Sequence, residues 1–258
     1  MINEVSVIMS EYNTPPCQLK KAIQSILDQT YTQFEFIIVN DGKSKQLEKI
    51  VREINDDRII IVQNEKNIGL PKSLNKAIDK AKNEYLVRMD TDDIAYPNRI
   101  ARLVEYITAH PEYAVVGSSI QIFDENGERE KIIRDVEINR NLLMKRIAPV
   151  HPSVIMKKSA IKSVGGYKNY NRCEDFVLWS ELLLSDYKIR IIPDILLKYH
   201  LGQDDFSKRK LKHRRDELKA RWKYYNKMGA TPIQKLSIIK SVISALIPSK
   251  ILYKYKKG

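Results

Sequence analysis

Short apolar runs alternate with longer amphipathic patterns along the first ninety residues of the chain. The short runs predict strands at Val5–Met9, Phe34–Val39, Ile59–Val62 and Tyr85–Arg88. Between them, apolar residues recur at the three- and four-residue spacing of a helix that packs on a sheet. Because the strands are almost continuously apolar, we expect both of their faces to be buried. The alternation therefore predicts an α/β fold, with a mainly parallel sheet and helices on both faces.

Beyond Asp93 the pattern becomes less regular. Asp124–Gly127 carries strong turn chemistry, and the pair Gly165-Gly166 punctuates the second half. The other elements expected there are a helix at Arg99–Ile107 and strands at Ala114–Ser119, Ser153–Met156 and Ile189–Ile192.

The net charge of +13 comes from the C-terminal part of the sequence. Residues 206–258 contain 16 lysines and arginines but two acids, which gives +14, whereas residues 1–205 carry −1. This change in composition predicts a boundary near residue 205 and a basic tail after it.

The two cysteines and the N-terminal residues bear on the cellular compartment. Cys17 and Cys173 lie far apart without a Cys-x-x-Cys spacing, so neither a zinc site nor a disulfide framework is expected. The N-terminus lacks the basic start and long apolar stretch of a signal peptide. No run approaches the roughly 18 apolar residues of a membrane-spanning helix. We therefore expect a cytoplasmic protein.

Polar side chains follow three of the predicted strands where each strand ends. Ser10-Glu11-Tyr12-Asn13 follows the first strand, Asn40-Asp41-Gly42 the second and Asp90-Thr91-Asp92-Asp93 the fourth. In an open α/β sheet, ligands bind at the carboxyl ends of the strands. The sequence therefore predicts a binding site at this edge.

Asp90, Asp92 and Asp93 place three carboxylates within four residues. They repel one another unless a cation joins them, and hard oxygen ligands on a short loop suit Mg²⁺ or Mn²⁺. Such a metal commonly bridges protein carboxylates to substrate phosphates. The cluster predicts a divalent metal site, and the alternative is a solvated acidic turn that caps a helix.

Two further acidic segments each have two interpretations. Asp41 either accepts hydrogen bonds from the base or ribose of a nucleotide or caps the following helix. Glu174-Asp175 either supplies a general base for an attacking hydroxyl or is ordinary acid enrichment at a helix N-terminus.

A series of short motifs, ordered over about 200 residues, resembles the family 2 glycosyltransferases. The first strand runs into Ser10-Glu11-Tyr12-Asn13 and is followed by Ile26–Tyr31. The other motifs, in the family's order, are Asn40-Asp41-Gly42, Asn67-Ile68-Gly69, Arg88-Met89-Asp90-Thr91-Asp92-Asp93, His151-Pro152-Ser153-Val154, Gly165-Gly166-Tyr167 and Glu174-Asp175-Phe176-Val177-Leu178-Trp179. The basic tail lies outside the resemblance.

The resemblance implies a Rossmann-like GT-A fold, with a nucleotide-sugar-binding half at residues 1–98 and an acceptor-binding half at residues 99–205. It also implies an inverting sugar transfer with Mn²⁺ or Mg²⁺ as cofactor. It assigns nucleotide-sugar binding to Ser10, Tyr12, Asp41, Lys72, Asp90 and Asp92, metal binding to Asp92, Asp93 and His200, base catalysis to Asp175 with Glu174 beside it, and acceptor binding to His151 and Trp179.

Two positions depart from the family's motifs. Asn40 stands where many members have an aspartate, although the second acid, Asp41, is kept. Relatives often carry Tyr-Arg-x-His near the end of the domain, where this chain has Lys198-Tyr199-His200. His200 also has an ordinary interpretation as a core or loop histidine, and Lys72 as a surface lysine.

The reaction that the resemblance implies moves a hexose from a UDP-sugar to a saccharide hydroxyl. General similarity to capsule and lipopolysaccharide enzymes favours UDP-galactose as donor. It also favours a lipid-linked oligosaccharide as acceptor, in surface polysaccharide synthesis.

The basic tail, residues 206–258, predicts amphipathic helices. Trp222, Tyr224 and Tyr225 lie among lysines and arginines, and Leu236 and Ile239 begin an apolar series at helical spacing. Basic helices with aromatic and apolar anchors are typical of attachment to an anionic membrane surface. We expect peripheral attachment to the inner face of the cell membrane. A packed helical pair with a solvated basic face and a homodimer contact are the alternatives.

Two other classes of function share some of these features. A nucleic-acid-binding protein agrees with the isoelectric point near 9.5 but not with the acid-rich edge of a near-neutral main domain. A metal-dependent nucleotidyltransferase also uses clustered aspartates on an α/β sheet. It is expected to carry a glycine-rich basic loop after the first strand, where this chain has Glu11–Pro15.

Overall fold

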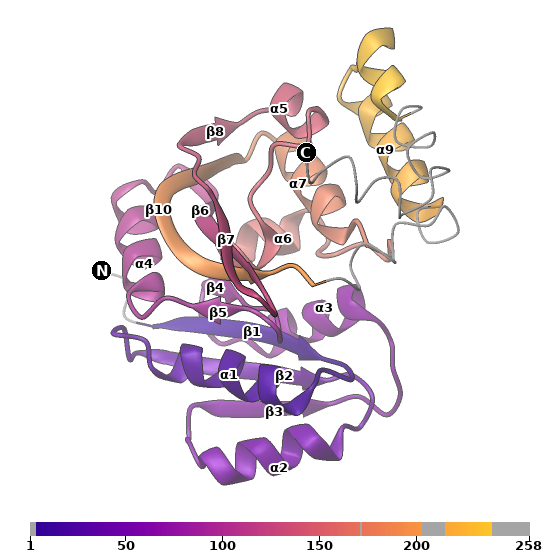
Figure 1. The fold of residues 1–258 in the computed structure, drawn as a ribbon. Helices are drawn as coiled ribbons and strands as arrows, with labels where there is room; N and C mark the ends of the chain where they lie inside the picture. The colour runs from indigo at the N-terminus through magenta and orange to yellow at the C-terminus, as the bar shows by residue number, and fades with distance from the viewer. Residues whose placement is uncertain (1–3, 171, 203–214, 239–258) are drawn as a thin grey trace.

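A parallel four-stranded unit forms the N-terminal half of the protein in the computed structural model, which describes residues 4–170, 172–202 and 215–238 (Figure 1). Its elements are β1 (Val5–Glu11), α1 (Pro16–Leu27), β2 (Phe34–Asn40), α2 (Lys45–Ile54), β3 (Ile59–Gln63), α3 (Leu70–Lys80) and β4 (Tyr85–Arg88). The strands lie in the order β3-β2-β1-β4, and every neighbouring pair is parallel. The carboxyl ends of β1, β2 and β4 therefore meet at one edge.

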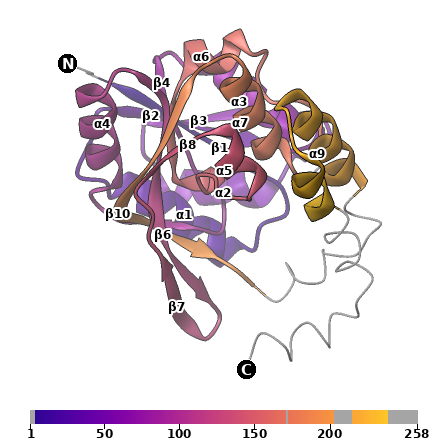
Figure 2. The ribbon, with the colours of Figure 1, turned by 90° about the horizontal axis from the view of Figure 1, so that it is seen from above.

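The second half of the chain extends the same sheet with mixed pairing. Its elements are β5 (Ile94–Ala95), α4 (Arg99–Ala109), β6 (Tyr113–Asp124), β7 (Gly127–Ile132), β8 (Val136–Ile138), α5 (Arg140–Met144), the 3-10 helix η1 (His151–Ser153), β9 (Val154–Lys157), α6 (Lys158–Ser163), α7 (Glu174–Leu184), β10 (Lys188–His200) and α9 (Arg215–Lys227). The sheet continues from β4 through β9, β6 and β10 to β5, while β7 pairs with β6 and β8 with β10. The β6–β7 hairpin extends away from the body of the molecule (Figure 2).

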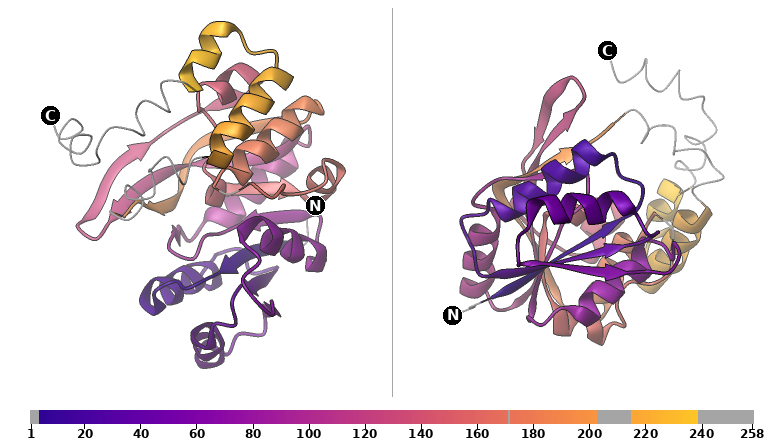
Figure 3. Two further views of the ribbon diagram at one scale, coloured as in Figure 1. Left: turned by 90° about the vertical axis from the view of Figure 1, so that its right-hand side faces the viewer. Right: turned by 90° about the horizontal axis from the view of Figure 1, so that it is seen from below.

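Helices cover both faces of the sheet (Figures 1 and 3). Val7 and Met9 of β1 pack in one hydrophobic core with buried residues of α1, α2 and α4. Ile8, which lies between them, packs in the other core with residues of α3, α6 and α7. Alternate residues of β1 thus enter different cores, which explains why the strand is apolar without a break.

The sequence-based expectations for the fold are confirmed in class and corrected in detail. The strand at Tyr85–Arg88 has the predicted limits, whereas β1 continues to Glu11 and so includes Ser10. Residues 151–153 form a 3-10 turn, so the strand expected from Ser153 begins at Val154. The expected turn at Asp124–Gly127 closes the β6–β7 hairpin, whose second strand was not predicted.

Strand β10 connects the end of the domain to its start. It pairs in parallel with β6 over most of its length, and near its end Leu197 and Lys198 pair with the short strand β5. Because β5 lies directly after Asp93, this pairing brings His200 to the loop that follows β4.

Arg99, the first residue of α4, ties three segments together. Its side chain is fully buried, and Nη2 donates to the carbonyl oxygens of Arg88 at 2.6 Å and Pro152 at 2.5 Å. These bonds join the end of β4, the start of α4 and the turn η1. Burial lowers the pKa of the Arg99 guanidinium to about 9, and nearby Asp93 opposes that shift.

The described part of the basic tail packs on the domain. Tyr224 of α9 donates to Glu181 of α7 at 2.6 Å, and Tyr225 donates to the carbonyl oxygen of Met144 at 2.5 Å. The packed arrangement left open by the sequence thus holds for one face of α9 (Figure 3). The tail residues 206–214 and 239–258, where most of the predicted amphipathic pattern falls, lie outside the described residues. Within the described ranges, no helix has the length and apolar character needed to cross a membrane.

We expect Arg99→Met to destabilise the fold by about 3 kcal/mol, because it leaves two buried carbonyl oxygens without a charged donor. Arg102→Met on the same helix is the control, since the half-exposed Arg102 makes surface ion pairs with Asp194 and Glu105 that contribute about 0–1 kcal/mol. Urea unfolding of both variants measures the difference, and equal losses of stability would contradict the role given to Arg99.

Candidate functional site

The edge where β1, β2 and β4 end holds the predicted nucleotide segments. Ser10 is partly exposed and Tyr12 is 53% exposed. The Tyr12 ring covers Gly42, where an added Cβ would lie 2.9 Å from two ring carbons, and the φ of Gly42 is +155°. Only glycine fits both the contact and the conformation. The Tyr12 ring therefore lies exposed at this edge, in contact with the turn at Gly42.

Asp41 is almost fully buried and accepts three hydrogen bonds. They come from the backbone N–H groups of Ile68 at 2.8 Å and Gly69 at 2.9 Å, and from Asn64 Nδ2 at 2.9 Å. Asp41 therefore holds the loop that leads into α3. The alternative that it caps α2 is wrong, because Ser44 is the N-cap and accepts from Leu47 N. Its predicted contact with a nucleotide stays a prediction.

Asn40 has a structural reason for differing from the family's usual aspartate. Its side chain accepts from Ser44 N at 2.8 Å and donates to the Ser44 carbonyl oxygen at 3.1 Å. A carboxylate could accept the first bond but could not donate the second. The amide therefore suits the turn that begins α2.

The three aspartates after β4 come together as the sequence predicts. One carboxylate oxygen from each of Asp90, Asp92 and Asp93 lies within 4.8 Å of the others. Asp93 is 1% exposed; Oδ1 accepts from His200 N at 2.8 Å, while the buried Oδ2 has no hydrogen-bond partner. Burial, and then the charges of Asp90 and Asp92, raise the pKa of Asp93 well above its ordinary value.

These residues fit a hard divalent cation. A buried carboxylate oxygen without a partner costs free energy unless a proton or a cation satisfies it. Carboxylate oxygens are the ligands that Mg²⁺ and Mn²⁺ prefer. The site therefore suits the predicted metal by its chemistry, although it does not select between the two ions.

His200 lies beside the aspartate cluster. Its Nδ1 is 3.5 Å from Asp92 Oδ2, and its Nε2 is 3.8 Å from Glu125 Oε1 at the tip of the β6–β7 hairpin. The ring also contacts Phe123 edge-on, with 5.3 Å between centroids. The structure thus brings His200 to the metal residues, and it adds Glu125, which sequence reasoning treated only as part of a turn.

Glu174 and Asp175 form the first turn of α7. Asp175 Oδ1 accepts from Phe176 N at 2.6 Å, and the residue is partly exposed to solvent. Burial, and then the charge of Asp175, raise the pKa of Glu174 to about 7. Burial also raises the pKa of Asp175. The protonation of each carboxyl therefore depends on the charge of the other.

His151 and Trp179 lie deeper than residues that contact an acceptor directly. His151 is 8% exposed, and its Nε2 shares a 2.7 Å hydrogen bond with Tyr167 Oη. Burial, and then the charge of Arg88, hold the pKa of His151 well below its ordinary value, so the ring is neutral. Trp179 is fully buried against His151, with 6.2 Å between ring centroids. Trp179 thus packs the site from behind.

Tyr167 ends the Gly165-Gly166-Tyr167 motif, and sequence reasoning assigned it no role. Its backbone N–H donates to Asn75 Oδ1 at 2.8 Å, and its carbonyl accepts from Asn75 Nδ2 at 2.8 Å. A Cβ on Gly166 would lie 2.5 Å from Asn75 Oδ1. The Gly-Gly-Tyr motif therefore packs closely against Asn75 of α3. This contact joins segments far apart in the chain, so local sequence does not reveal it.

Arg88 is the second residue that sequence reasoning missed. Its side chain is 1% exposed, and Nη1 forms an ion pair with Asp90 Oδ2. Burial lowers the pKa of the guanidinium, but Asp90 outweighs that effect, so the net shift is upward and the group stays charged. A lone arginine inside an apolar strand, two residues before an acidic cluster, was the available signal.

Lys72 lies exposed in the first turn of α3, the helix whose leading loop Asp41 holds. Lys72 is thus a surface lysine near the strand ends. Its predicted contact with the donor phosphates stays a prediction.

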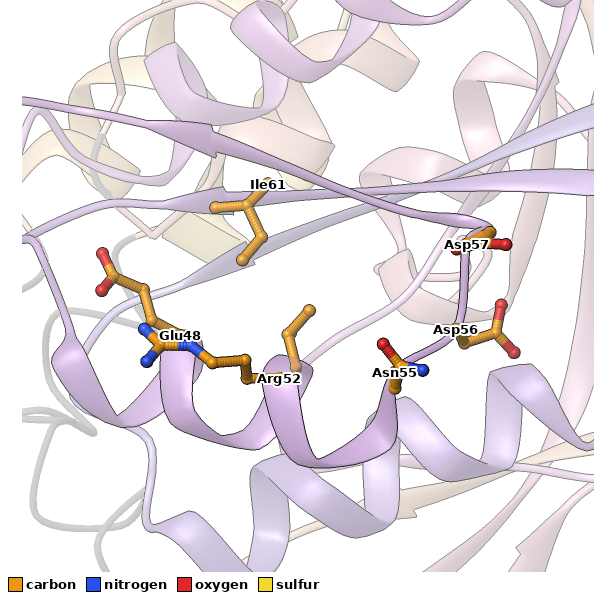
Figure 4. Close-up of a pocket in the computed structure, with 7 residues that line it drawn as sticks. Glu48, Arg52, Asn55, Asp56, Asp57 and Ile61 are labelled. Carbon is orange, nitrogen blue, oxygen red and sulfur yellow. The ribbon is translucent and has the colours of Figure 1, made fainter.

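A separate pocket of about 330 Å³ lies between α2 and the outermost strand β3 (Figure 4). The residues that line it are Glu48, Val51, Arg52, Asn55, Asp56, Asp57 and Ile61. It contains none of the clustered aspartates or partnerless buried carboxylates described above. The chemistry of the strand ends, rather than the size of a hollow, therefore locates the functional site.

Comparison with known proteins points to one family. The model of the family described as Glycosyl transferase family 2 matches residues 6–165. The amylovoran biosynthesis glycosyltransferase AmsE of Erwinia amylovora is 32% identical over 212 residues, covering 80% of this chain and 79% of that protein. An Escherichia coli protein named UDP-Gal:alpha-D-GlcNAc-diphosphoundecaprenol beta-1,3-galactosyltransferase is 29% identical over 265 residues, 98% of this chain and 95% of that protein.

Among solved structures, S. aureus TarS 1-349 in complex with UDP has a similar fold. The TM-score is 0.69, with 18% identity, over 94% of this chain and 70% of that chain. The likeness confirms the expected α/β fold of GT-A type, with its mixed sheet and helices on both faces.

The protonation of Glu174 makes stability depend on pH. Its pKa of about 7 lies above the ordinary 4.5, so the protonated form stabilises the fold below pH 4.5, and that contribution is lost as pH rises to about 7. Glu174→Gln imitates the protonated acid. At pH 8 we expect the variant to exceed wild type by on the order of 2 kcal/mol, with convergence at pH 4.

Denaturant unfolding at several pH values measures this difference. The exposed Glu53, on α2, provides the control Glu53→Gln. A stability difference between Glu174→Gln and wild type that does not change from pH 4 to pH 8 would contradict the raised pKa.

Proposed function

The chain belongs to glycosyl transferase family 2, and on that premise we propose that it is a metal-dependent, inverting hexosyltransferase that uses a UDP-sugar. One observation carries the proposal. The aspartate cluster, with the partnerless Asp93 Oδ2, lies at the strand ends that bind nucleotides in α/β sheets. Glu174 and Asp175 begin α7, and burial raises the pKa of both carboxyls.

The donor that we propose is a UDP-hexose. Ser10 and the exposed ring of Tyr12 are available for the base and ribose, and Lys72 for the phosphates. Asp41 contributes by holding the loop before α3, with its own oxygens already occupied. Support for the nucleotide comes from TarS, whose crystal structures contain UDP and UDP-GlcNAc. The name of the Escherichia coli relative supports galactose.

Asp92, Asp93 and His200 are the residues that would hold the metal, and Asp90 lies beside them. A Mn²⁺ or Mg²⁺ ion held by these residues would supply positive charge against the diphosphate leaving group. Asp93 Oδ1 accepts from His200 N, and its buried Oδ2 has no hydrogen-bond partner among the described residues. Oδ2 is therefore available as an oxygen ligand.

The reaction that we propose is a single displacement with Asp175 as base. Asp175 takes the proton of the acceptor hydroxyl, and that oxygen attacks the anomeric carbon from the face opposite the diphosphate. As the new C–O bond forms, the bond to the diphosphate oxygen breaks, so the configuration inverts. Asp175 suits this step better than Glu174 because it keeps solvent exposure. Glu174 is the more deeply buried carboxyl of the pair, and its pKa is raised by the charge of Asp175.

The acceptor that we propose is a saccharide hydroxyl on a lipid-linked oligosaccharide in surface polysaccharide synthesis. The names of the two relatives support this, since one refers to amylovoran biosynthesis and the other to a diphosphoundecaprenol acceptor. We propose that His151, neutral and bonded to Tyr167, shapes the acceptor side of the site rather than contributing charge.

We also propose that the protein binds the inner face of the cell membrane through α9 and the helical residues 232–238. Trp222 is 54% exposed, Ile233 79% and Leu236 50%, and Lys235 Nζ lies 5.8 Å from the centroid of the Trp222 ring. Apolar anchors among lysines suit an anionic lipid surface. Residues 239–258 continue the pattern in sequence, with five more lysines and no acid. Each lysine contributes about 1 kcal/mol of binding near such a surface.

Calorimetric titration of UDP tests the donor site. Wild type is expected to bind UDP with Mn²⁺ and to lose binding in EDTA. Asp93→Asn is expected to weaken metal-dependent binding at least ~10-fold, because it removes a charged ligand. Asp175→Asn is expected to keep the affinity within about threefold but to lower sugar transfer by ~10²–10⁴-fold.

The exposed Asp79, paired with Lys162 on the surface, gives the control Asp79→Asn. Wild type that binds no UDP with Mn²⁺ present contradicts the donor, and full turnover by Asp175→Asn contradicts the base.

Vesicle flotation tests the membrane surface. The full chain is expected to float with vesicles that contain anionic lipid and not with neutral vesicles. The triple variant Trp222→Ala, Ile233→Ser and Leu236→Ser is expected to lose at least about 2 kcal/mol of binding, because its apolar anchors are gone. Ile133→Ser, at an exposed isoleucine outside the helices, is the control. Unchanged flotation of the triple variant, or self-association through this surface, would contradict membrane attachment.

A further inference from the structure

Two loops of the site leave neighbouring strands and meet again through a side-chain hydrogen bond. β1 and β4 pair in parallel, so the segments that follow them begin side by side. Beyond the strand ends, Thr14 Oγ1 donates to Thr91 Oγ1 at 2.7 Å. Thr91 is the second residue of the aspartate loop, residues 90–93, whereas Thr14 follows Tyr12 by two residues. The bond therefore joins the segment proposed for the nucleotide to the loop proposed for the metal.

The backbone around Thr14 is restricted by its neighbours. The Thr14 N–H group donates to Glu11 Oε1 at 3.0 Å, and Glu11 is 1% exposed at the end of β1. Asn13 takes a left-handed conformation, with a φ of +57°, which asparagine adopts more readily than most residues. Pro15 and Pro16 follow, and each proline ring fixes its own φ. The chain thus presents the Thr14 hydroxyl from a well-defined turn.

Contacts among the described residues hold the aspartate loop at its start, middle and end. Arg88 pairs with Asp90 at the start, and His200 N donates to Asp93 at 2.8 Å at the end. Thr91 makes the contact between them. The first two contacts come from β4 and β10, so neither reaches the segment after β1. The threonine pair supplies the side-chain contact to that segment.

A nucleoside diphosphate is the class of ligand that needs both loops at once. Under the proposed function, its base and ribose contact Ser10 and Tyr12, and its phosphates contact a metal held by Asp92 and Asp93. A nucleoside alone contacts the first pair of residues. A bond between the loops therefore matters most for a ligand that spans them, since an error in their spacing loses contacts at one end or the other.

We propose that Thr14 is a positioning residue for the donor, because its hydroxyl bond to Thr91 sets the spacing between the nucleotide segment and the aspartate loop. The inference rests on the proposed function for the ligands of the two loops. The bond acts through the loops and needs no contact of either hydroxyl with the ligand. It favours a metal-bound nucleoside diphosphate over a ligand that contacts one loop alone.

Titration of the full chain with two ligands, UDP by calorimetry and uridine by NMR, separates this role from local damage. Thr14→Val removes the hydroxyl and keeps the β-branched shape. We expect it to weaken UDP binding with Mn²⁺ ~3–10-fold, the usual effect of one lost hydrogen bond, and to leave uridine binding within about twofold. Thr14→Ser restores the hydroxyl, so most of the UDP affinity is expected to return.

Thr91→Val and the double variant test whether the two hydroxyls act through each other. Because either single substitution breaks the same bond, the double variant is expected to bind UDP about as weakly as each single variant. Thr108→Val is the matched control, since it removes a hydroxyl bond to the Val104 carbonyl oxygen near the other end of α4. Additive losses, equal losses for uridine and UDP, or no recovery with serine would overturn the proposal.

Urea unfolding of the ligand-free chains keeps this inference distinguishable from the proposed function. If wild type binds no UDP, the proposed function fails. The unfolding midpoints of the two single variants and the double variant still report the bond: losses that do not add support the link between the loops, and additive losses overturn it. Non-additive midpoints together with unchanged UDP affinity overturn the positioning role, because the bond then contributes to stability alone.

Discussion

Two buried guanidinium groups, separated by ten residues in sequence, hold the working edge of this molecule together. Arg99 donates to the backbone at the end of β4 and to the turn before β9, and Arg88 pairs with the first aspartate of the cluster. Together with the bond from His200 N to Asp93, these contacts hold the loop after β4. The aspartates, the turn η1 and the start of α4 all take their positions from this pair.

The site concentrates negative charge where solvent is largely excluded. Burial raises the pKa of Asp92, Asp93, Glu174 and Asp175. Such a group of carboxylates remains ionised only where cations compensate, so Arg88 and a bound metal have complementary tasks.

Hydrogen bonds between side chains and backbone N–H groups hold the loops around the site. Asp41 holds the loop before α3, Asn40 holds the turn before α2, and Asn75 docks the Gly-Gly-Tyr segment. Each of these residues had been interpreted from its motif alone, or not at all. Sequence reasoning identified the motifs but could not separate a residue that contacts ligand from one that supports the loop, because the partners of Asn75 lie 92 residues away.

The sequence by itself determined the fold class, the edge that carries the site and the three clustered aspartates, since strand periodicity and strand-end chemistry are local properties. Tertiary structure alone decided that His200 and Glu125 reach that cluster, because a long β10 and the β6–β7 hairpin converge there. It also buried Trp179 against His151 and paired the buried Arg88 with Asp90. Those outcomes depend on which distant segments pack together, and no local pattern records that.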